Sequence, residues 1–145
     1  MPIGKLDHVN LRTHRVKEMV DWYGRVLGMP SGQRPDFPFP GAWLYSDGVP
    51  TVHLNGVEQV GTQSSDLALE HFAFKASGLK EFIARLETQA ERFEIAYVPG
   101  RPILQINVWD PDGNHIHIDF AAAEADGVNL PKAVMFGAGG KLTTM

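Results

Sequence analysis

The chain repeats itself once, and this repeat constrains the fold more than any other feature of the sequence. The run LDHVNL at residues 6–11 returns as LEHFAF at residues 69–74, 63 residues later. The segments VKEMV and TVHL then return in the same order, 63 and 64 residues later, as LKEFI and HIHI. Three matched segments in order indicate two copies of one structural module.

The repeat divides the chain into segments. One module spans about residues 5–55 and the other about 68–120, and a polar linker of residues 56–67 contains Gly and Ser. We expect residues 1–120 to form a single domain. Residues 121–145 lie outside the repeat, and we expect them to form a tail or an arm that packs on a second subunit.

Each module begins with a strand. Val9 and Leu11 alternate with His8 and Asn10, which is the period-2 pattern of a strand with one buried face. The matching run LEHFAF has the same alternation. We expect the apolar side chains on one face of each strand to pack against the helices.

A helix follows the first strand of each module. Apolar residues at helical spacing predict helices over about 14–27 and 78–91, with Gly28 at the end of the first and Ser77 as the N-cap of the second. Strand-like stretches separated by turn residues follow each helix. The sequence therefore predicts an α+β fold built from two βαβββ modules.

Composition excludes several classes of function. A net charge of -4 with 13 basic and 17 acidic residues gives no electrostatic footprint for nucleic acid. With no cysteine, a disulfide scaffold, a thiolate metal site and a cysteine nucleophile are excluded. No run of 18 apolar residues and no signal-peptide pattern is present, so we expect a cytoplasmic protein with no membrane contact.

Four of the six histidines occupy equivalent places in the repeat, His8 with His71 and His53 with His117. Strand alternation places all four on the side of the sheet away from the helices. If the two sheets curl toward each other, four imidazoles converge in one cleft, and neutral imidazole is a common ligand of divalent transition metals. His115 shares a face with His117, and we expect it to be exposed at the start of its strand.

These segments resemble a known family. LDHVNL, DWYGRVLGM, VHL, LEHFAF and DPDGNHIHIDF are similar to the two βαβββ modules of the vicinal oxygen chelate superfamily, which includes glyoxalase I, methylmalonyl-CoA epimerase, fosfomycin-resistance transferases, bleomycin-binding proteins and extradiol dioxygenases. The resemblance implies a U-shaped mixed-sheet cup around a divalent metal, which two neighbouring substrate oxygens chelate. It also implies that such chains often dimerise, and we expect a homodimer.

The resemblance implies a set of ligands. The family positions map onto His8, His71 and His117 and, in four-ligand members, onto His53; in three-ligand members His53 is our candidate catalytic base. The family usually has Glu at the position of His117, and glyoxalase I also has a carboxylate at the position of His53. Imidazoles leave the 2+ charge of the metal (Fe, Mn, Ni, Co, Zn or Cu) without a compensating ligand, so an anionic substrate oxygen is favoured.

The same strand faces suggest a substrate pocket. Trp43, Tyr45, Gln105 and Asn107 have the parity to line the cup, and Arg101 on a nearby loop is a candidate for binding a carboxylate or phosphate. Rigid aromatic rings beside amides suit a flat, partly polar organic ligand.

Three functions are compatible with this sequence. The first is a metal-dependent dioxygenase or lyase/isomerase that acts on a small substrate with vicinal oxygens. The second is a metal-independent binding or resistance protein that sequesters an aromatic compound. The third is a thiol transferase similar to the fosfomycin-resistance enzymes. One fold of this kind carries unrelated reactions, so the fold alone does not choose between them.

Overall fold

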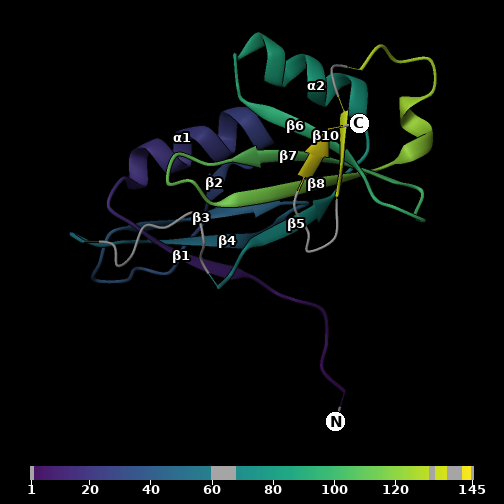
Figure 1. Ribbon diagram of the computed structural model, residues 1–145. Coiled ribbons are helices and arrows are strands. Elements are labelled where there is room, and N and C mark those ends of the chain that lie inside the picture. Colours follow the sequence, from purple (N-terminus) through teal and green to yellow (C-terminus); the bar gives the residue numbers. More distant parts are fainter. Residues whose placement is uncertain (1, 60–67, 131–132, 137–141, 145) are drawn as a thin grey trace. The chain divides into compact units, whose positions relative to one another are not determined.

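The computed structural model of the protein describes residues 2–59, 68–130, 133–136 and 142–144 (Figure 1). The chain divides into two compact units, Met1–Ser65 and Asp66–Met145, and each is described by itself.

The first unit has a four-stranded mixed sheet and one helix. Its elements are β1 (Val9–Thr13), α1 (Val16–Leu27), β2 (Ser31–Gly32), β3 (Gly41–Ser46) and β4 (Val49–Gly56). The strand order is β1-β4-β3-β2, with β1 parallel to β4 and the other pairs antiparallel.

The second unit repeats this topology and extends it. Its elements are β5 (His71–Lys75), α2 (Leu79–Thr88), β6 (Phe93–Tyr97), β7 (Ile103–Trp109), β8 (His115–Ala121), the 3-10 helix η1 (Ala122–Ala125), β9 (Ala133–Phe136) and β10 (Leu142–Thr144). The order β5-β8-β7-β6 matches that of the first unit, and β9 and β10 continue the sheet beyond β6. The predicted α+β fold of two βαβββ modules is therefore confirmed.

The two faces of each sheet have different side chains. In the first unit, Leu44, Val52 and Leu54 are fully buried beside the apolar face of α1, which buries Met19 and Tyr23. In the second unit α2 buries the set Leu79, Phe82, Ile83 and Leu86, and the Phe82 ring lies 5.7 Å from that of Phe120 on β8. Because side chains alternate along a strand, the residues between these core positions point to the opposite face.

The helix ends agree with the sequence at one point and differ at another. α1 ends where predicted, with Gly28 in the left-handed conformation (φ 68°), which glycine adopts at little cost. Ser77 is not the N-cap of α2; the cap is Gly78, and the carboxylate of Glu124 on η1 accepts hydrogen bonds from the backbone N–H of Gly78 (2.8 Å) and Leu79 (3.0 Å). A distant carboxylate therefore replaces the local hydroxyl that the sequence suggested.

The DPDGN motif forms the turn between β7 and β8. The Asp110 carboxylate accepts hydrogen bonds from the backbone N–H of Asp112 and Asn114 and from the Asn114 side chain, each at 2.9 Å. Gly113 has φ 83°, a conformation that favours glycine. This turn sets where β8 begins, and with it the positions of His115 and His117.

Several expectations fall partly outside this description. Residues 60–67 of the linker and 131–132, 137–141 and 145 of the C-terminal segment lie outside the described residues. Within the described part, η1 and β9 belong to the second unit, while the role of residues 121–145 as a dimer arm stays a prediction. The U-shaped cup also stays a prediction.

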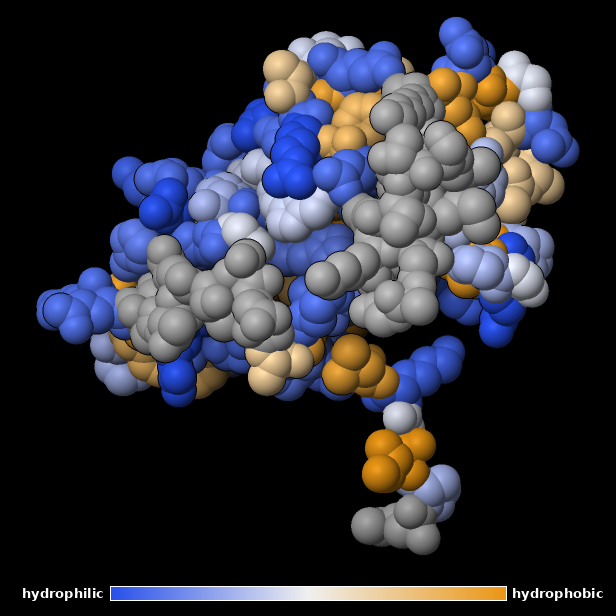
Figure 2. Space-filling view, viewed as in Figure 1, coloured by the Kyte–Doolittle hydropathy of each residue, from blue (hydrophilic) through white to orange (hydrophobic). Residues whose placement is uncertain are grey.

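Residues 2–8 run as an extended segment away from the first sheet (Figure 1). Ile3 is 98% exposed and Leu6 is 82% exposed, and Figure 2 shows hydrophobic surface on this segment. Among the described residues, no helix combines the length and the hydropathy needed to cross a bilayer.

Candidate metal centre

The first unit brings His8 and His53 together. His53 lies on β4 opposite Asn10, and His8 is two residues before Asn10, so the two histidines share a face of the sheet. Their rings stack with centroids 4.0 Å apart and planes 10° apart. Trp43, opposite His53 in the β3–β4 ladder, stacks on the His53 ring at 4.1 Å. The result is a column of three aromatic rings.

Hydrogen bonds use one nitrogen of each imidazole in this pair. The Asp7 carboxylate accepts from His8 Nδ1 at 2.6 Å, and His53 Nε2 donates to the Pro50 carbonyl at 3.0 Å. His53 is 8% exposed, and this burial, followed by the proximity of His8, lowers its pKa below 6.5. His53 is therefore neutral at pH 7, with its lone pair on Nδ1.

The second unit contains an equivalent pair. His117 lies on β8 opposite Ala73 of β5, and its ring stacks on that of His71 with centroids 3.9 Å apart and planes 13° apart. His117 is 3% exposed. Burial, with smaller contributions from His71 and His115, lowers the pKa of His117 to about 4. This ring is neutral at pH 7, which is the form that binds a metal.

His115 makes this pair a cluster of three. One ring nitrogen from each of His71, His115 and His117 lies within 4.8 Å of the others, close enough for the group to hold a metal ion. The side chain of His115 is 13% exposed, so the expectation that it is exposed at the strand start is wrong. Trp109 stacks on it at 5.1 Å, and the Arg92 guanidinium covers Trp109 at 4.0 Å.

Both nitrogens of His115 have hydrogen-bond partners within the protein. Nδ1 donates to Glu70 Oε1 at 3.0 Å, and Nε2 lies 2.8 Å from the side-chain amide of Asn107. Glu70 also accepts a hydrogen bond from His71 Nδ1 through its other oxygen. These hydrogen bonds lower the pKa of Glu70, the one from His71 most. In this arrangement both ring nitrogens of His115 are engaged by Glu70 and Asn107, whereas His71, with its N–H on Nδ1, has its lone pair on Nε2.

These residues fit a divalent transition metal. The donors are imidazole nitrogens, which suit Zn, Ni, Co, Fe and Cu, and two of the rings are neutral because they are buried. Metal-bound histidines in proteins commonly donate their second N–H to a carboxylate or a backbone carbonyl. Asp7, Pro50 and Glu70 supply such acceptors to His8, His53 and His71.

The predicted substrate residues have different surroundings. Trp43 lies on the His53 ring, and Asn107 is fully buried, with its amide donating to the Glu94 carbonyl at 3.3 Å. Gln105 lies opposite Asp119 in the same β7–β8 ladder. Tyr45 donates its hydroxyl to the Gln33 carbonyl, and Arg101 is exposed on the loop between β6 and β7. The substrate-binding role of these five residues stays a prediction.

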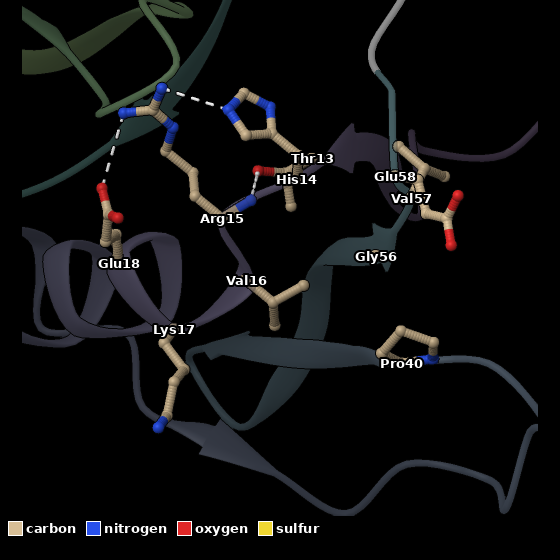
Figure 3. Close-up of a pocket in the computed structure, with 10 residues that line it drawn as sticks. All are labelled: Thr13, His14, Arg15, Val16, Lys17, Glu18, Pro40, Gly56, Val57 and Glu58. Atoms are coloured by element: carbon tan, nitrogen blue, oxygen red, sulfur yellow. Dashed lines mark hydrogen bonds and ion pairs between the residues drawn. The ribbon is translucent and has the colours of Figure 1, made fainter.

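A hollow in the first unit lies at the start of α1, apart from the predicted site residues (Figure 3). Its volume is about 710 Å³. The residues that line it are Thr13, His14, Arg15, Val16, Lys17, Glu18, Pro40, Gly56, Val57 and Glu58. The Arg15 guanidinium is already engaged by Glu18 at 3.4 Å and by His14 at 3.3 Å.

Sequence reasoning missed Glu70 and the packing of His115. One signal was present: an acidic residue directly precedes the first histidine of both modules, Asp7 before His8 and Glu70 before His71. For His115, the shared parity with His117 placed it on the correct face, but only the three-dimensional structure brings Asn107, Trp109 and Glu70 around it.

Comparisons with known proteins agree with this architecture. The family model of the glyoxalase/bleomycin resistance protein/dioxygenase superfamily matches residues 5–118. Glyoxylase I 4 of Arabidopsis thaliana is 28% identical over 120 residues, covering 78% of this chain and 68% of the relative.

Solved structures share the fold. A Bacillus anthracis protein described as glyoxalase family has a TM-score of 0.70 at 24% identity, covering 83% of this chain and 98% of its own. Lactoylglutathione lyase from Agrobacterium tumefaciens has a TM-score of 0.63 at 15% identity, and the match covers 84% of this chain and 97% of the lyase chain. The fosfomycin resistance protein FosX from Listeria monocytogenes has a TM-score of 0.64 at 11% identity, and the match covers 85% of this chain and 98% of the FosX chain.

Proposed function

Because the chain belongs to the glyoxalase/bleomycin resistance protein/dioxygenase superfamily, we propose that it is a divalent-metal-dependent enzyme whose small substrate binds through two neighbouring oxygen atoms. The reaction is that of a dioxygenase or of a lyase/isomerase. The observation that carries this proposal is the stacked imidazole pair that each unit forms, His8 with His53 and His71 with His117.

The proposal gives three of these imidazoles one role. His8, His71 and His117 are metal ligands. The metal, when bound, lowers the pKa of a coordinated hydroxyl, and an all-imidazole set leaves its positive charge uncompensated. Burial keeps His117 neutral. Asp7 and Glu70 accept hydrogen bonds from Nδ1 of His8 and His71, so that in both rings Nε2 carries the lone pair that binds the metal.

His53 has two alternative roles in this proposal, as a metal ligand or as a base, and one excludes the other. Its Nε2 is used by the Pro50 carbonyl, so Nδ1 is the one ring nitrogen that can either bind the metal or accept a substrate proton. A lowered pKa makes the ring neutral at pH 7, as both roles require. As a base, His53 takes the proton on Nδ1 and keeps its bond to Pro50.

The substrate is flat and partly polar in this proposal. Trp43, already stacked on His53, offers an aromatic face, and Gln105 offers an amide group on the face of β7 next to His117; Asn107 shares this face, and its amide is held by Glu94 and His115. Arg101 is exposed and able to bind a carboxylate or phosphate, and Tyr45 completes the proposed set.

Elemental analysis by plasma mass spectrometry tests the proposal. We expect stoichiometric Fe, Mn, Ni, Co, Zn or Cu in the purified protein and its loss in His8→Ala, His71→Ala and His117→Ala. His14→Ala is the matched control, because His14 is exposed and outside both stacked pairs. A protein that binds no stoichiometric metal even after reloading would contradict the proposal.

One observation favours a second candidate function. The ring column of Trp43, His53 and His8 would also suit a metal-independent protein that sequesters an aromatic compound. In that case the metal-free protein would bind an aromatic ligand tightly, with quenching of tryptophan fluorescence that Trp43→Leu reduces. Binding that requires the metal would exclude this candidate.

A further inference from the structure

The carboxylate of Glu70 connects two of the three histidines in the second unit. Its Oε2 accepts a hydrogen bond from His71 Nδ1 and its Oε1 accepts one from His115 Nδ1 at 3.0 Å. Glu70 directly precedes β5, whereas His115 opens β8, which is 45 residues further along the chain. One carboxylate therefore fixes two rings that come from different strands.

The geometry decides which nitrogen of His71 carries the proton. An ionised carboxylate only accepts hydrogen bonds, so the contact requires the N–H of His71 to be on Nδ1. In the neutral ring the lone pair is then on Nε2. A histidine without such a partner is not restricted to this tautomer, and the molecules with the proton on Nε2 present no lone pair there to a ligand site.

The other end of this hydrogen-bond chain is anchored in the core. His115 Nε2 lies 2.8 Å from the side-chain amide of Asn107, which is fully buried, and the Asn107 amide nitrogen donates to the Glu94 carbonyl. Trp109 stacks on the His115 ring, and the Arg92 guanidinium lies over Trp109. Although Glu70 is 65% exposed as a side chain, its position is therefore determined by a rigid neighbour.

The first unit contains the carboxylate–histidine contact but not the second histidine. Asp7 holds His8 Nδ1 at 2.6 Å, as Glu70 holds His71. The position equivalent to His115 is Thr51, whose hydroxyl pairs with Ser46 at 2.7 Å. The bridge between two imidazoles is therefore specific to the second unit among the described residues.

We propose that Glu70 is a positioning residue that fixes the Nδ1–H tautomer of His71, presents His71 Nε2 to the metal, and ties this ligand through His115 to Asn107. This inference rests on the proposed function, because it assigns His71 as a ligand. His115 is then the link between the carboxylate and the core, and it does not bind the metal.

The experiment measures the tautomer and the metal affinity separately, on the full chain. Long-range proton–nitrogen NMR at pH 8 reports the His71 tautomer in the metal-free protein, and calorimetric titration with Co²⁺ alone reports the affinity. The variants are Glu70→Ala and Glu70→Gln. Glu87→Ala is the matched control, since Glu87 is an exposed carboxylate of α2 in the same unit.

We expect His71 to be Nδ1–H in the wild type and in Glu87→Ala, and to lose this preference in Glu70→Ala. Loss of such a carboxylate weakens metal binding by about 10- to 100-fold. Glu70→Gln is expected to be intermediate, because its single amide oxygen can accept from only one of the two rings. Wild-type folding, checked by the near-ultraviolet circular dichroism of each variant, separates positioning from unfolding.

Two results would overturn the inference and they differ from each other. If the wild type binds Co²⁺ and Glu70→Ala binds it equally well, or keeps the same His71 tautomer, Glu70 has no positioning role while the proposed function stands. If the wild type itself binds no Co²⁺, the proposed function fails and this assignment fails with it.

Discussion

His115 and His117 stand two residues apart on β8, yet their surroundings give them different chemistry. Both nitrogens of His115 are hydrogen-bonded within the protein, to Glu70 and Asn107, whereas His117 is buried as a neutral ring beside His71. A lone pair is needed for ligation, so position on a common strand face does not make two histidines equivalent.

Substituting the two residues separately tests this difference. We expect His117→Ala to lose the bound metal, whereas His115→Ala keeps the stoichiometry and weakens the affinity by no more than about 10- to 100-fold, the usual effect of a group that supports a ligand. Metal content after dialysis and calorimetric titration with Co²⁺ give the two numbers. Equal loss of metal in both variants would make His115 a ligand.

The buried His117 also predicts a pH dependence of stability. Its pKa is about 4 in the fold against 6.5 in the unfolded chain, so between these values the unfolded state binds more protons. The stability of the metal-free protein is therefore complete above about pH 6.5 and falls as the pH drops toward 4. The loss from this group is on the order of 3 kcal/mol.

Urea unfolding of the metal-free protein at pH 4, 5, 6 and 7 measures this effect. As the pH is lowered from 7 to 4, we expect the free energy of unfolding to fall less steeply in His117→Gln than in the wild type, because the amide does not titrate. Matching slopes in the two proteins would show that His117 does not have the lowered pKa.

At the residue scale, the sequence predicted which histidines share the sheet face away from the helices, but not that they stack in pairs within each unit or how they are held. The repeat and the strand parity were sufficient to place His8, His53, His71 and His117 on that face, and the structure adds the stacking of His8 on His53 and of His71 on His117. The contacts from Glu70 and Asn107 to His115 join residues 45 and 8 positions apart, and no local periodicity reports such contacts.

At the scale of elements, α2 depends on a residue beyond the repeat. Glu124 on η1 accepts from the first two N–H groups at the start of this helix, and its negative charge lies at the positive end of the helix dipole. We expect Glu124→Ala to lower the free energy of unfolding by about 1 kcal/mol, as the loss of an N-cap side chain does.

Urea unfolding at neutral pH checks this prediction, with Glu87→Ala as a carboxylate substitution in the same helix that removes no cap. A variant as stable as the control would mean that water replaces the carboxylate at no cost.

The elements themselves were largely predictable, because each rests on local information. Apolar spacing identified both helices, and Gly28 marked the end of α1 through its left-handed conformation. The predicted N-cap of α2, Ser77, is wrong, because the residue that satisfies the first N–H groups of this helix is 46 residues from Gly78.

At the scale of the molecule, we propose that two chains associate. β1 and β5 each pair on one side only in the described sheets, and such edges are usually covered in proteins. Three large apolar side chains near these strands, Ile3, Leu6 and Leu69, are 98%, 82% and 62% exposed. A second copy of the chain would cover them.

Light scattering is expected to give twice the 16.0 kDa of one chain. Replacing Ile3 and Leu6 together by Ser should shift the protein toward the monomer at equal concentration, because the apolar area buried on association is lost. A wild-type mass of 16.0 kDa at every concentration tested would exclude the homodimer.

Two copies of one module need not make the same contacts. Both units have a stacked imidazole pair, while the position of His115 is occupied in the first unit by Thr51, whose hydroxyl pairs with that of Ser46. A duplicated architecture therefore does not make its two halves interchangeable: the second unit holds an imidazole between Glu70 and Asn107, where the first has a hydroxyl beside Ser46.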